Sequence, residues 1–356
     1  MKKEFEKELS PEVREKMRKN LVYVSIFSII MLFAGLTSAY IVSMGDSFWL
    51  KTPLPNAFWI STTIIILSSI SIEYAVRSSK SKTKKGIRIG ILLTLLLGVS
   101  FVYFQFKGYS ELIDNGIYAT QNHILVNNGR YGEKCKIKMN DKDITVNGNS
   151  YFLSGSEIKD SEYNELKMFM NQFLNLARKT QPANRKYKEN NQFKLFYNNN
   201  LISFKDGNLY QNDTLQLQYT DLLEFYYLAA HISANRGDFY VKGEIGKDFN
   251  IYFKGEELSY KNRQLYRKGN TKPLPKHLQR KAIETADSAA SYLYILTFVH
   301  LLHIFVSCLY LTRLSIQSFK GEFDGGDFLK LRLGSIFWHF FGFLWLYLVV
   351  FLLFIH

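Results

Sequence analysis

The sequence predicts an all-α transmembrane bundle of five helices, together with an inserted α+β extramembrane domain. Three observations lead to this fold class. Apolar residues crowd into five runs near the two ends of the 356-residue chain, while the middle is polar and rich in Asn, Lys and Tyr. Three similar segments recur within that polar middle. The mean hydropathy of −0.10 is therefore an average over two different populations.

Five runs are long enough to cross a membrane. A helix needs roughly 20 apolar residues to span a hydrocarbon core of about 30 Å. The runs are Leu21 to Val42, Ala57 to Val76, Ile87 to Phe106, Ser291 to Thr312, and Leu333 to Ile355. The first is too long for a cleavable signal peptide, and no small-residue cleavage site precedes Asp46.

The distribution of cations predicts the orientation of these spans. Seven Lys and Arg precede the first run, residues 77–88 hold six cations and no acid, and residues 313–332 carry Arg313, Lys320, Lys330 and Arg332. The positive-inside rule places these three segments in the cytoplasm. We therefore expect a multi-pass membrane protein, with the insert and the C-terminus on the outer face. The expected organisation is a cytoplasmic segment 1–20, helices 1–3 in 21–112, the outer repeat domain in 113–288, and helices 4–5 in 289–356.

Charge and cysteine content exclude several protein classes. Residues 108–288 hold 26 Lys and Arg against 21 acids, a net of +5, so most of the +14 lies elsewhere and nucleic-acid binding is not expected. The two cysteines, Cys135 and Cys308, rule out a disulfide scaffold, and no Cys-x-x-Cys motif offers ligands for c-type haem or a thiolate zinc site. The absence of a phosphate-binding Gly-rich loop argues against an ATP-driven pump.

The polar insert is predicted to contain about three β-β-β-α repeats. Three segments align without gaps at spacings of 58 and 56 residues: Ile137 to Phe152, Leu195 to Tyr210, and Ile251 to Tyr266. Their alternation predicts short strands, with Asn147-Gly148 and Asp206-Gly207 in turns. Helical patterns follow at Ser161 to Arg178, Thr220 to Ser233 and Lys276 to Asp287. The aromatic residues of the insert either fill its core or form a docking surface for a redox partner or neighbouring subunit.

Four ionisable groups lie inside the spans: Glu73, His300, His303 and His339. Glu73 is one turn before Arg77, so we expect it to snorkel or to pair with that arginine. His300 and His303 share a helix face, which suits either haem or metal ligation or hydrogen bonds to a neighbouring helix. A haem or metal site would need further histidines on a partner helix, and only His339 is available there. This favours hydrogen bonds to a neighbouring helix as the role of the two histidines. His123, His231 and His277 are too scattered in sequence to predict a metal cluster.

The spans resemble a known family. Span three with its exit, Leu92 to Leu112, is similar to the helix of haem-copper oxidase subunit III that has a Leu-Gly-x-x-Phe core followed by Gln. Span four, Ser291 to Ser307, resembles the family's helix with two histidines, at His300 and His303. Span five resembles its terminal Trp-His-Phe helix, through Trp338, His339, Phe340 and Trp345. Span two fits through Ser61-Thr62 and Leu67-Ser68-Ser69. The match corresponds to the five-helix bacterial form, with a large periplasmic insertion. It implies a multi-pass protein of the bacterial inner membrane, with the insert and the C-terminus in the periplasm.

The resemblance implies a non-catalytic core subunit of a cytochrome c oxidase-type terminal oxidase in aerobic respiratory electron transport. Haem and copper would lie in partner subunits I and II, so we expect no catalytic, cofactor-binding or metal-binding residue in this chain. Bound phospholipid is expected in a cleft of the bundle. The residues implied in interhelical or lipid-cleft contacts are His300, His303, Trp338, His339 and Trp345.

Two departures from the family pattern argue against a proton-relay role. Ile29 and Gly342 stand where family members carry carboxylates. The expected partners are subunits I and II and a quinol:cytochrome c reductase in a supercomplex, which the insert would help to dock. The alternatives are an accessory or assembly membrane protein of a haem-copper oxidase or nitric oxide reductase, and a standalone haem-binding redox enzyme.

Overall fold

The computed structural model describes residues 10–177, 187–321 and 328–355 of the chain. It divides into two compact units. The membrane unit comprises residues 1–43, 53–113 and 289–356, and the extramembrane unit comprises residues 44–52 and 114–288. The extramembrane unit therefore includes residues 44–52, which lie between the first two predicted spans. The predicted inner cations Lys2, Lys3 and Lys7, and the predicted helix end at Arg178, lie outside the described residues.

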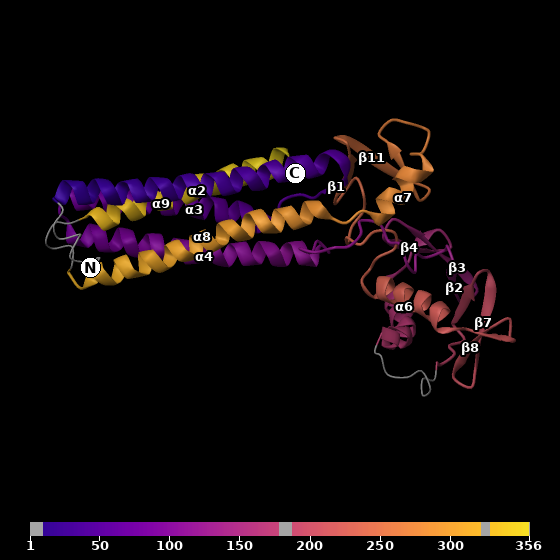
Figure 1. Cartoon of the computed structure of the whole chain (residues 1–356). Coiled ribbons are helices and arrows are strands. Elements are labelled where there is room, and N and C mark those ends of the chain that lie inside the picture. Colours follow the sequence, from indigo (N-terminus) through magenta and orange to yellow (C-terminus); the bar gives the residue numbers. More distant parts are fainter. Residues whose placement is uncertain (1–9, 178–186, 322–327, 356) are drawn as a thin grey trace. The chain divides into compact units, whose positions relative to one another are not determined.

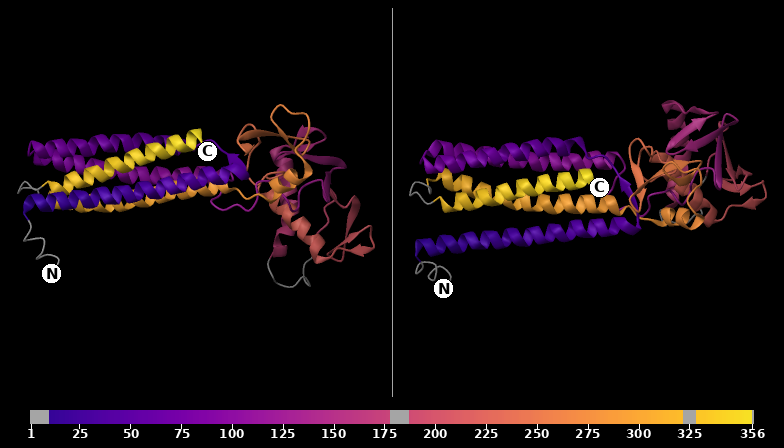
Figure 2. Two further views of the ribbon diagram at one scale, coloured as in Figure 1. Left: turned by 45° about the horizontal axis from the view of Figure 1, so that its top comes forward. Right: turned by 90° about the horizontal axis from the view of Figure 1, so that it is seen from above.

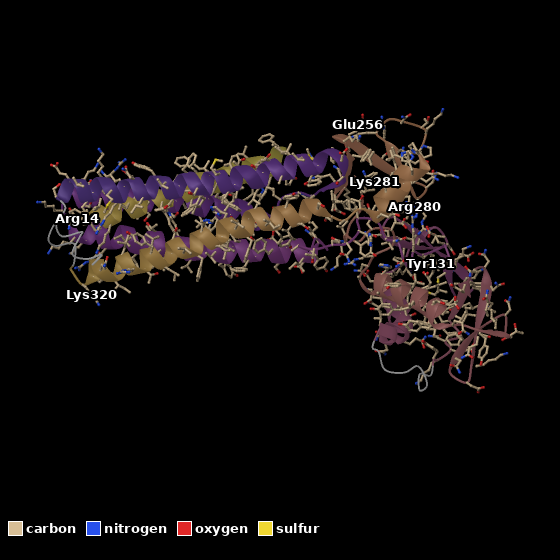
Figure 3. The ribbon with its side chains drawn as sticks, viewed as in Figure 1. Arg14, Tyr131, Glu256, Arg280, Lys281 and Lys320 are labelled. Carbon is tan, nitrogen blue, oxygen red and sulfur yellow. The ribbon has the colours of Figure 1, made fainter. Side chains whose placement is uncertain are left out.

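Five long helices run alongside one another in the membrane unit (Figures 1 and 2). Each is long and apolar enough to cross a membrane, so the chain is a multi-pass membrane protein. They are α2 (Pro11–Asp46), α3 (Asn56–Lys80), α4 (Lys84–Asp114), α8 (Ser288–Phe319) and α9 (Leu329–Phe354). Arg14 and Lys320, from two of the predicted cytoplasmic segments, lie at the same end of the bundle (Figure 3). The orientation and the kind of membrane stay predictions.

Small residues let α3 and α4 approach closely. A Cβ on Gly90 would lie 2.6 Å from the Cβ of Ala75, which is closer than two carbon atoms can pack. Ser71 on α3 also donates a hydrogen bond to the Gly90 carbonyl at 3.1 Å. Because lipid tails are as apolar as the helix surfaces, such close approaches and buried hydrogen bonds are what hold membrane helices together.

The extramembrane unit contains two antiparallel sheets and short helices. The eight-stranded sheet has the order β5-β4-β3-β2-β6-β7-β8-β9, and the four-stranded sheet has the order β1-β10-β11-β12. The strands are β1 (Phe48–Lys51), β2 (Cys135–Met139), β3 (Lys142–Asn147), β4 (Ser150–Leu153), β5 (Ser156–Glu157), β6 (Phe193–Tyr197), β7 (Asn200–Lys205), β8 (Asn208–Gln211), β9 (Leu215–Gln216), β10 (Asn250–Phe253), β11 (Glu256–Lys261) and β12 (Gln264–Arg267).

Each of the three similar segments forms antiparallel hairpins. Two-residue turns with positive φ at both positions join neighbouring strands, as at Asn140-Asp141 and Asn198-Asn199. The predicted turn at Asp206-Gly207 is one of these, with φ values of 50° and 81°. Such turns match the twist of the flanking strands and favour Asn, Asp and Gly, which tolerate a left-handed backbone. This preference explains why the Asn-rich composition accompanies the repeated segments.

Strand β1 was not predicted from the sequence. Phe48 lies opposite Phe253, and Leu50 lies opposite Ile251, in the antiparallel pairing of β1 with β10. The Phe48 and Phe253 rings stack with centroids 4.5 Å apart. Four apolar-rich residues directly after a membrane span show too little alternation to predict a strand. Their partner is about 200 residues away in sequence, and only the fold supplies it.

The helices of this unit are α5 (Asp160–Met170), α6 (Tyr219–Ser233), α7 (Lys276–Glu284) and the 3-10 segment η1 (Asn171–Ala177). The helix predicted from Ser161 therefore tightens into 3-10 geometry at Asn171. Phe173 and Phe225 are fully buried between these helices, and their rings stack at 5.5 Å. The aromatic residues of the repeats thus form a core, which is the first of the two roles predicted for them.

A buried carboxylate connects the loops of this unit to the four-stranded sheet. The Asp238 side chain is fully buried, and its Oδ1 accepts hydrogen bonds from Arg130 Nε at 2.8 Å and Arg263 at 2.9 Å. Arg130 also donates to the hydroxyl of Tyr260 on β11. The hydrogen bond to Asp238 and its charge raise the pKa of Arg130 against the opposing effect of burial, which is the largest single influence. Two guanidinium groups therefore share one buried carboxylate.

Buried His231 makes the stability of the extramembrane unit dependent on pH. Its Nε2 donates a hydrogen bond to the Asn128 carbonyl at 2.8 Å, and burial lowers its pKa from 6.5 to about 4. The unfolded chain then binds a proton between pH 6.5 and pH 4 that the folded chain does not. Stability should consequently fall by about 3 kcal/mol as the pH drops through this window and stay level below it.

Hydrogen exchange of the α6 amides in the full-length chain, measured across this pH range, tests the prediction after correction for the intrinsic exchange rate. In His231→Gln, which retains a donor for Asn128, this part of the pH dependence should disappear. An unchanged pH profile in that variant would show that another group is responsible.

Candidate functional site: a polar and aromatic layer in the bundle

Two buried tryptophans of α9 bind hydroxyl groups of α3. Trp338 Nε1 donates to Ser68 Oγ at 2.9 Å, and Trp345 Nε1 donates to Thr62 Oγ1 at 2.9 Å. The two tryptophans are seven residues apart and so share a helix face. Their exposed fractions are 1% and 0%. A buried indole N–H needs a partner, and these hydroxyls supply one for each ring.

His300 lies in the same layer and connects α8 to α9. Its Nε2 is 3.0 Å from the Phe341 carbonyl oxygen, which can only accept, so Nε2 carries the proton. The imidazole also lies 5.3 Å from the Trp345 ring and 5.9 Å from the Phe101 ring. Its Nδ1 is buried and has no hydrogen-bond partner among the described residues. The geometry is that of an interhelical hydrogen bond.

Helix α4 completes the layer with the residues of its family-like motif. A Cβ on Gly98 would lie 2.7 Å from the Trp338 ring, so the missing side chain makes room for that indole. Phe101 meets Trp345 edge to face at 5.3 Å. Gln105 Nε2 donates to Ser61 Oγ of α3 at 2.8 Å. The motif residues of four spans therefore converge in space.

His303 faces a cavity that borders this layer at Trp338. Its Nδ1 donates to the Val299 carbonyl of its own helix at 2.7 Å, and its ring lies 6.1 Å from Phe33 of α2. The cavity has a volume of about 540 Å³ and is lined by residues of α2, α8 and α9, including Val22, Ile29, Val306, Phe337 and Trp338. Its lining is predominantly apolar, with Ser25, Ser307 and Tyr310 as polar exceptions. Such a lining suits an acyl chain better than a polar metabolite.

His339 makes a contact that the sequence analysis did not predict. Its Nε2 is 3.8 Å from Glu73 Oε2, and Glu73 pairs with Arg77 at 3.0 Å as predicted from their spacing. These side chains line a groove of about 530 Å³ between α3 and α9. Gly342 also lines it, where the family pattern has a carboxylate. The His339 contact joins two helices through polar atoms.

The chemistry available in this layer is hydrogen bonding and packing. In residues 10–177, 187–321 and 328–355, no group of three or more His, Cys, Asp or Glu is arranged to hold a metal ion. His300 and His303 point to different surroundings, the first to α9 and the second to the cavity and α2. The sequence could not place the Glu73–His339 contact or the cavity, because both depend on how α3, α8, α9 and α2 are rotated.

Comparison with models of known protein families, with curated proteins and with solved structures finds no match to this chain.

Proposed function

We propose that the chain is the non-catalytic subunit III of a cytochrome c oxidase-type terminal oxidase. One observation carries the proposal. Several residues on which the family resemblance rests, from four separate spans, lie against one another in a buried layer, whereas His303 and His339 lie outside it. Trp338 binds Ser68, Trp345 binds Thr62, and His300 contacts both α9 and Phe101. These contacts between motif residues of different spans support the proposal.

In this proposal the layer makes the bundle rigid so that it can hold subunit I. The hydrogen bonds join α3, α4, α8 and α9, and the cavity beside His303 holds phospholipid. Haem and copper belong to the partner subunits I and II. The subunit then stabilises the oxidase during O₂ reduction without taking part in the electron transfer itself.

Variants at His300 and His303 test this function because the two histidines make different contacts. His300→Ala removes the hydrogen bond between α8 and α9, whereas His300→Gln keeps a donor near the Phe341 carbonyl. We expect the alanine variant to lower the yield of assembled oxidase and to shorten the period over which the enzyme stays active during turnover. The glutamine variant should restore most of both.

His303→Ala enlarges the cavity without removing an interhelical hydrogen bond. We expect it to change the phospholipid retained by the purified oxidase while assembly stays normal. If neither alanine variant alters assembly, retained lipid or active lifetime, the proposed role is wrong. Val350 of α9 is exposed and lines neither the cavity nor the groove, so it offers a control position: Val350→Ala should change none of the three.

We also infer that the insert consists of about three β-β-β-α repeats. The first strands of two repeats, β2 and β6, pair antiparallel with Ile137 opposite Leu195. The first strand of the third repeat, β10, pairs instead with β1. The helices that follow are α5, α6 and α7. This arrangement explains why residues 48–51 join the unit: they occupy the position that another repeat would fill.

The insert then serves as a docking domain for a neighbouring oxidase subunit or for a quinol:cytochrome c reductase. Edge strand β9 supports this, because Leu215 is 63% exposed on an unpaired edge, where proteins usually avoid apolar residues. A photo-reactive amino acid at Leu215 should cross-link to one of these partners in whole membranes. The same probe at Glu157, on the opposite edge strand, is the matched control. Cross-links to neither partner from Leu215 would contradict the docking role.

A further inference from the structure

The positive charge of the insert is confined to one part of it. Residues 108–249 hold 17 Lys and Arg and 17 acids, whereas residues 250–288 hold nine Lys and Arg against four acids. The net +5 of the insert therefore lies entirely in the stretch that forms β10, β11, β12 and α7. The charges balance over the first 142 residues, and the excess of cations is confined to the last 39. This excess therefore needs a local explanation.

Four of these side chains share the outer face of α7. Lys276, His277, Arg280 and Lys281 follow the three-and-four spacing of one helix face, and all four are exposed. The other face holds the helix to the sheet, because Ala282 is buried and the Gln279 side chain bonds the backbone N–H and carbonyl of Leu265. Figure 3 shows Arg280 and Lys281 on this short helix.

Two cations of this region contact the last residue of a membrane helix. Lys281 Nζ donates to the Asp46 carbonyl at 2.8 Å, and Lys254 Nζ lies 3.8 Å from Asp46 Oδ1. Both ammonium groups also lie within 5.9 Å of the Phe253 ring centre. Asp46 is the final residue of α2. The two lysines are thus held where that helix ends.

Chain connectivity keeps the rest of the charged region near the ends of two more membrane helices. Three residues separate α7 from α8, and four separate β1 from α3. A chain covers at most about 3.6 Å per residue, so neither link can exceed roughly 20 Å. The C-terminal end of α7 therefore stays close in the chain to the beginning of α8, whichever way the two units are oriented.

A purely structural role accounts for only part of this cluster. Lys281 and Lys254 can complement the negative end of the α2 dipole. Among the described residues, Arg280 pairs only with Glu284, and both are highly exposed, so that pair adds little stability. Lys276 and His277 have neither an ion pair nor a hydrogen bond within the described part of the chain. The positive-inside rule also disfavours cations beside α8 on the predicted outer side, so topology does not explain them.

We propose that Lys254, Lys276, His277, Arg280 and Lys281 form a basic collar that binds the phosphates of anionic phospholipids. The lipids are those of the leaflet at which α2 ends and α3 and α8 begin. Each Lys or Arg near an anionic membrane surface contributes about a fivefold preference, and the effect decays over a Debye length of about 8 Å at physiological salt. This collar does not depend on the proposed oxidase function, because it concerns only this chain and the bilayer.

The test places the full-length chain in nanodiscs of phosphatidylcholine, with and without one quarter phosphatidylglycerol. Hydrogen exchange of peptides from residues 270–285 reports on α7 alone, so the cytoplasmic cations do not contribute. We expect phosphatidylglycerol to slow exchange in α7 by at least about tenfold, and high salt to reverse the effect. The triple variant Lys276→Glu, Arg280→Glu, Lys281→Glu should lose this protection.

A matched variant separates local binding from overall charge. Lys136→Glu, Lys142→Glu and Lys205→Glu change the charge by the same amount at exposed positions of the eight-stranded sheet, and they should leave the α7 protection intact. The proposal is overturned if phosphatidylglycerol does not protect α7 in the wild-type chain, which would leave an acidic protein as the alternative partner. It is also overturned if the matched variant loses protection equally.

Discussion

Replacing Trp345 with alanine should destabilise the membrane bundle by about 4 kcal/mol. The indole is completely buried and contacts Phe58, Phe101 and His300. Its loss leaves a cavity that these rings cannot refill and deprives Thr62 of its hydrogen-bond donor. Moving the indole from lipid into the bundle gives no hydrophobic gain, because both surroundings are apolar. Packing and the hydrogen bond therefore account for the whole effect.

Labelling of Cys308 measures this destabilisation. The thiol is free and buried within α8, and it reacts only when the bundle opens. Mass spectrometry distinguishes it from Cys135. In mixed micelles, Trp345→Ala should raise the labelling rate by nearly a thousandfold. Trp345→Phe should show a much smaller rise, and Phe343→Ala, at a side chain that is 71% exposed on the same helix, almost none. Equal rates in Trp345→Ala and Phe343→Ala would contradict the described packing.

Asp238→Ala should destabilise the extramembrane unit by about 4 kcal/mol. The substitution leaves two guanidinium groups facing each other without their shared carboxylate, and both are largely buried, with exposed fractions of 12% for Arg130 and 28% for Arg263. Removing one partner of a buried ion pair costs more than the pair itself contributes, since the remaining charge has lost its solvent as well.

Hydrogen exchange of the slowest amides in β10 and β11 of the full-length chain measures this effect. The control is Asp213→Ala, because Asp213 pairs with Lys205 at 3.2 Å where both side chains are exposed. That substitution should change exchange far less, because an ion pair between exposed side chains contributes little to stability. If Asp238→Ala and Asp213→Ala change exchange equally, the buried cluster does not connect the loops to the sheet.

The membrane helices could be predicted from the sequence because their signal is local. Each span is a continuous apolar run, and the Glu73–Arg77 pair lies within one turn of α3. The hairpins were predictable for the same reason, since turn residues such as Asp206-Gly207 specify their own geometry. Local chemistry decides these features, whatever the rest of the chain does.

Long-range contacts could not be predicted in the same way. The pairing of β1 with β10 joins residues 48–51 to residues 250–253, and nothing in Phe48-Trp49-Leu50-Lys51 identifies that partner. The Glu73–His339 contact depends on the rotation of α3 against α9. The resemblance named His300, Trp338 and Trp345 as contact residues, but it could not name their partners Phe341, Ser68 and Thr62.

Purification of the chain from native membranes through an affinity tag tests the proposed function most directly. Subunit III of a terminal oxidase should migrate on a blue-native gel with subunits I and II, in one copy each, and that band should show haem absorption and consume O₂. A chain that is absent from the mature oxidase but accompanies its assembly intermediates would be an accessory protein instead. A chain that migrates without any haem-copper subunit would contradict the proposal.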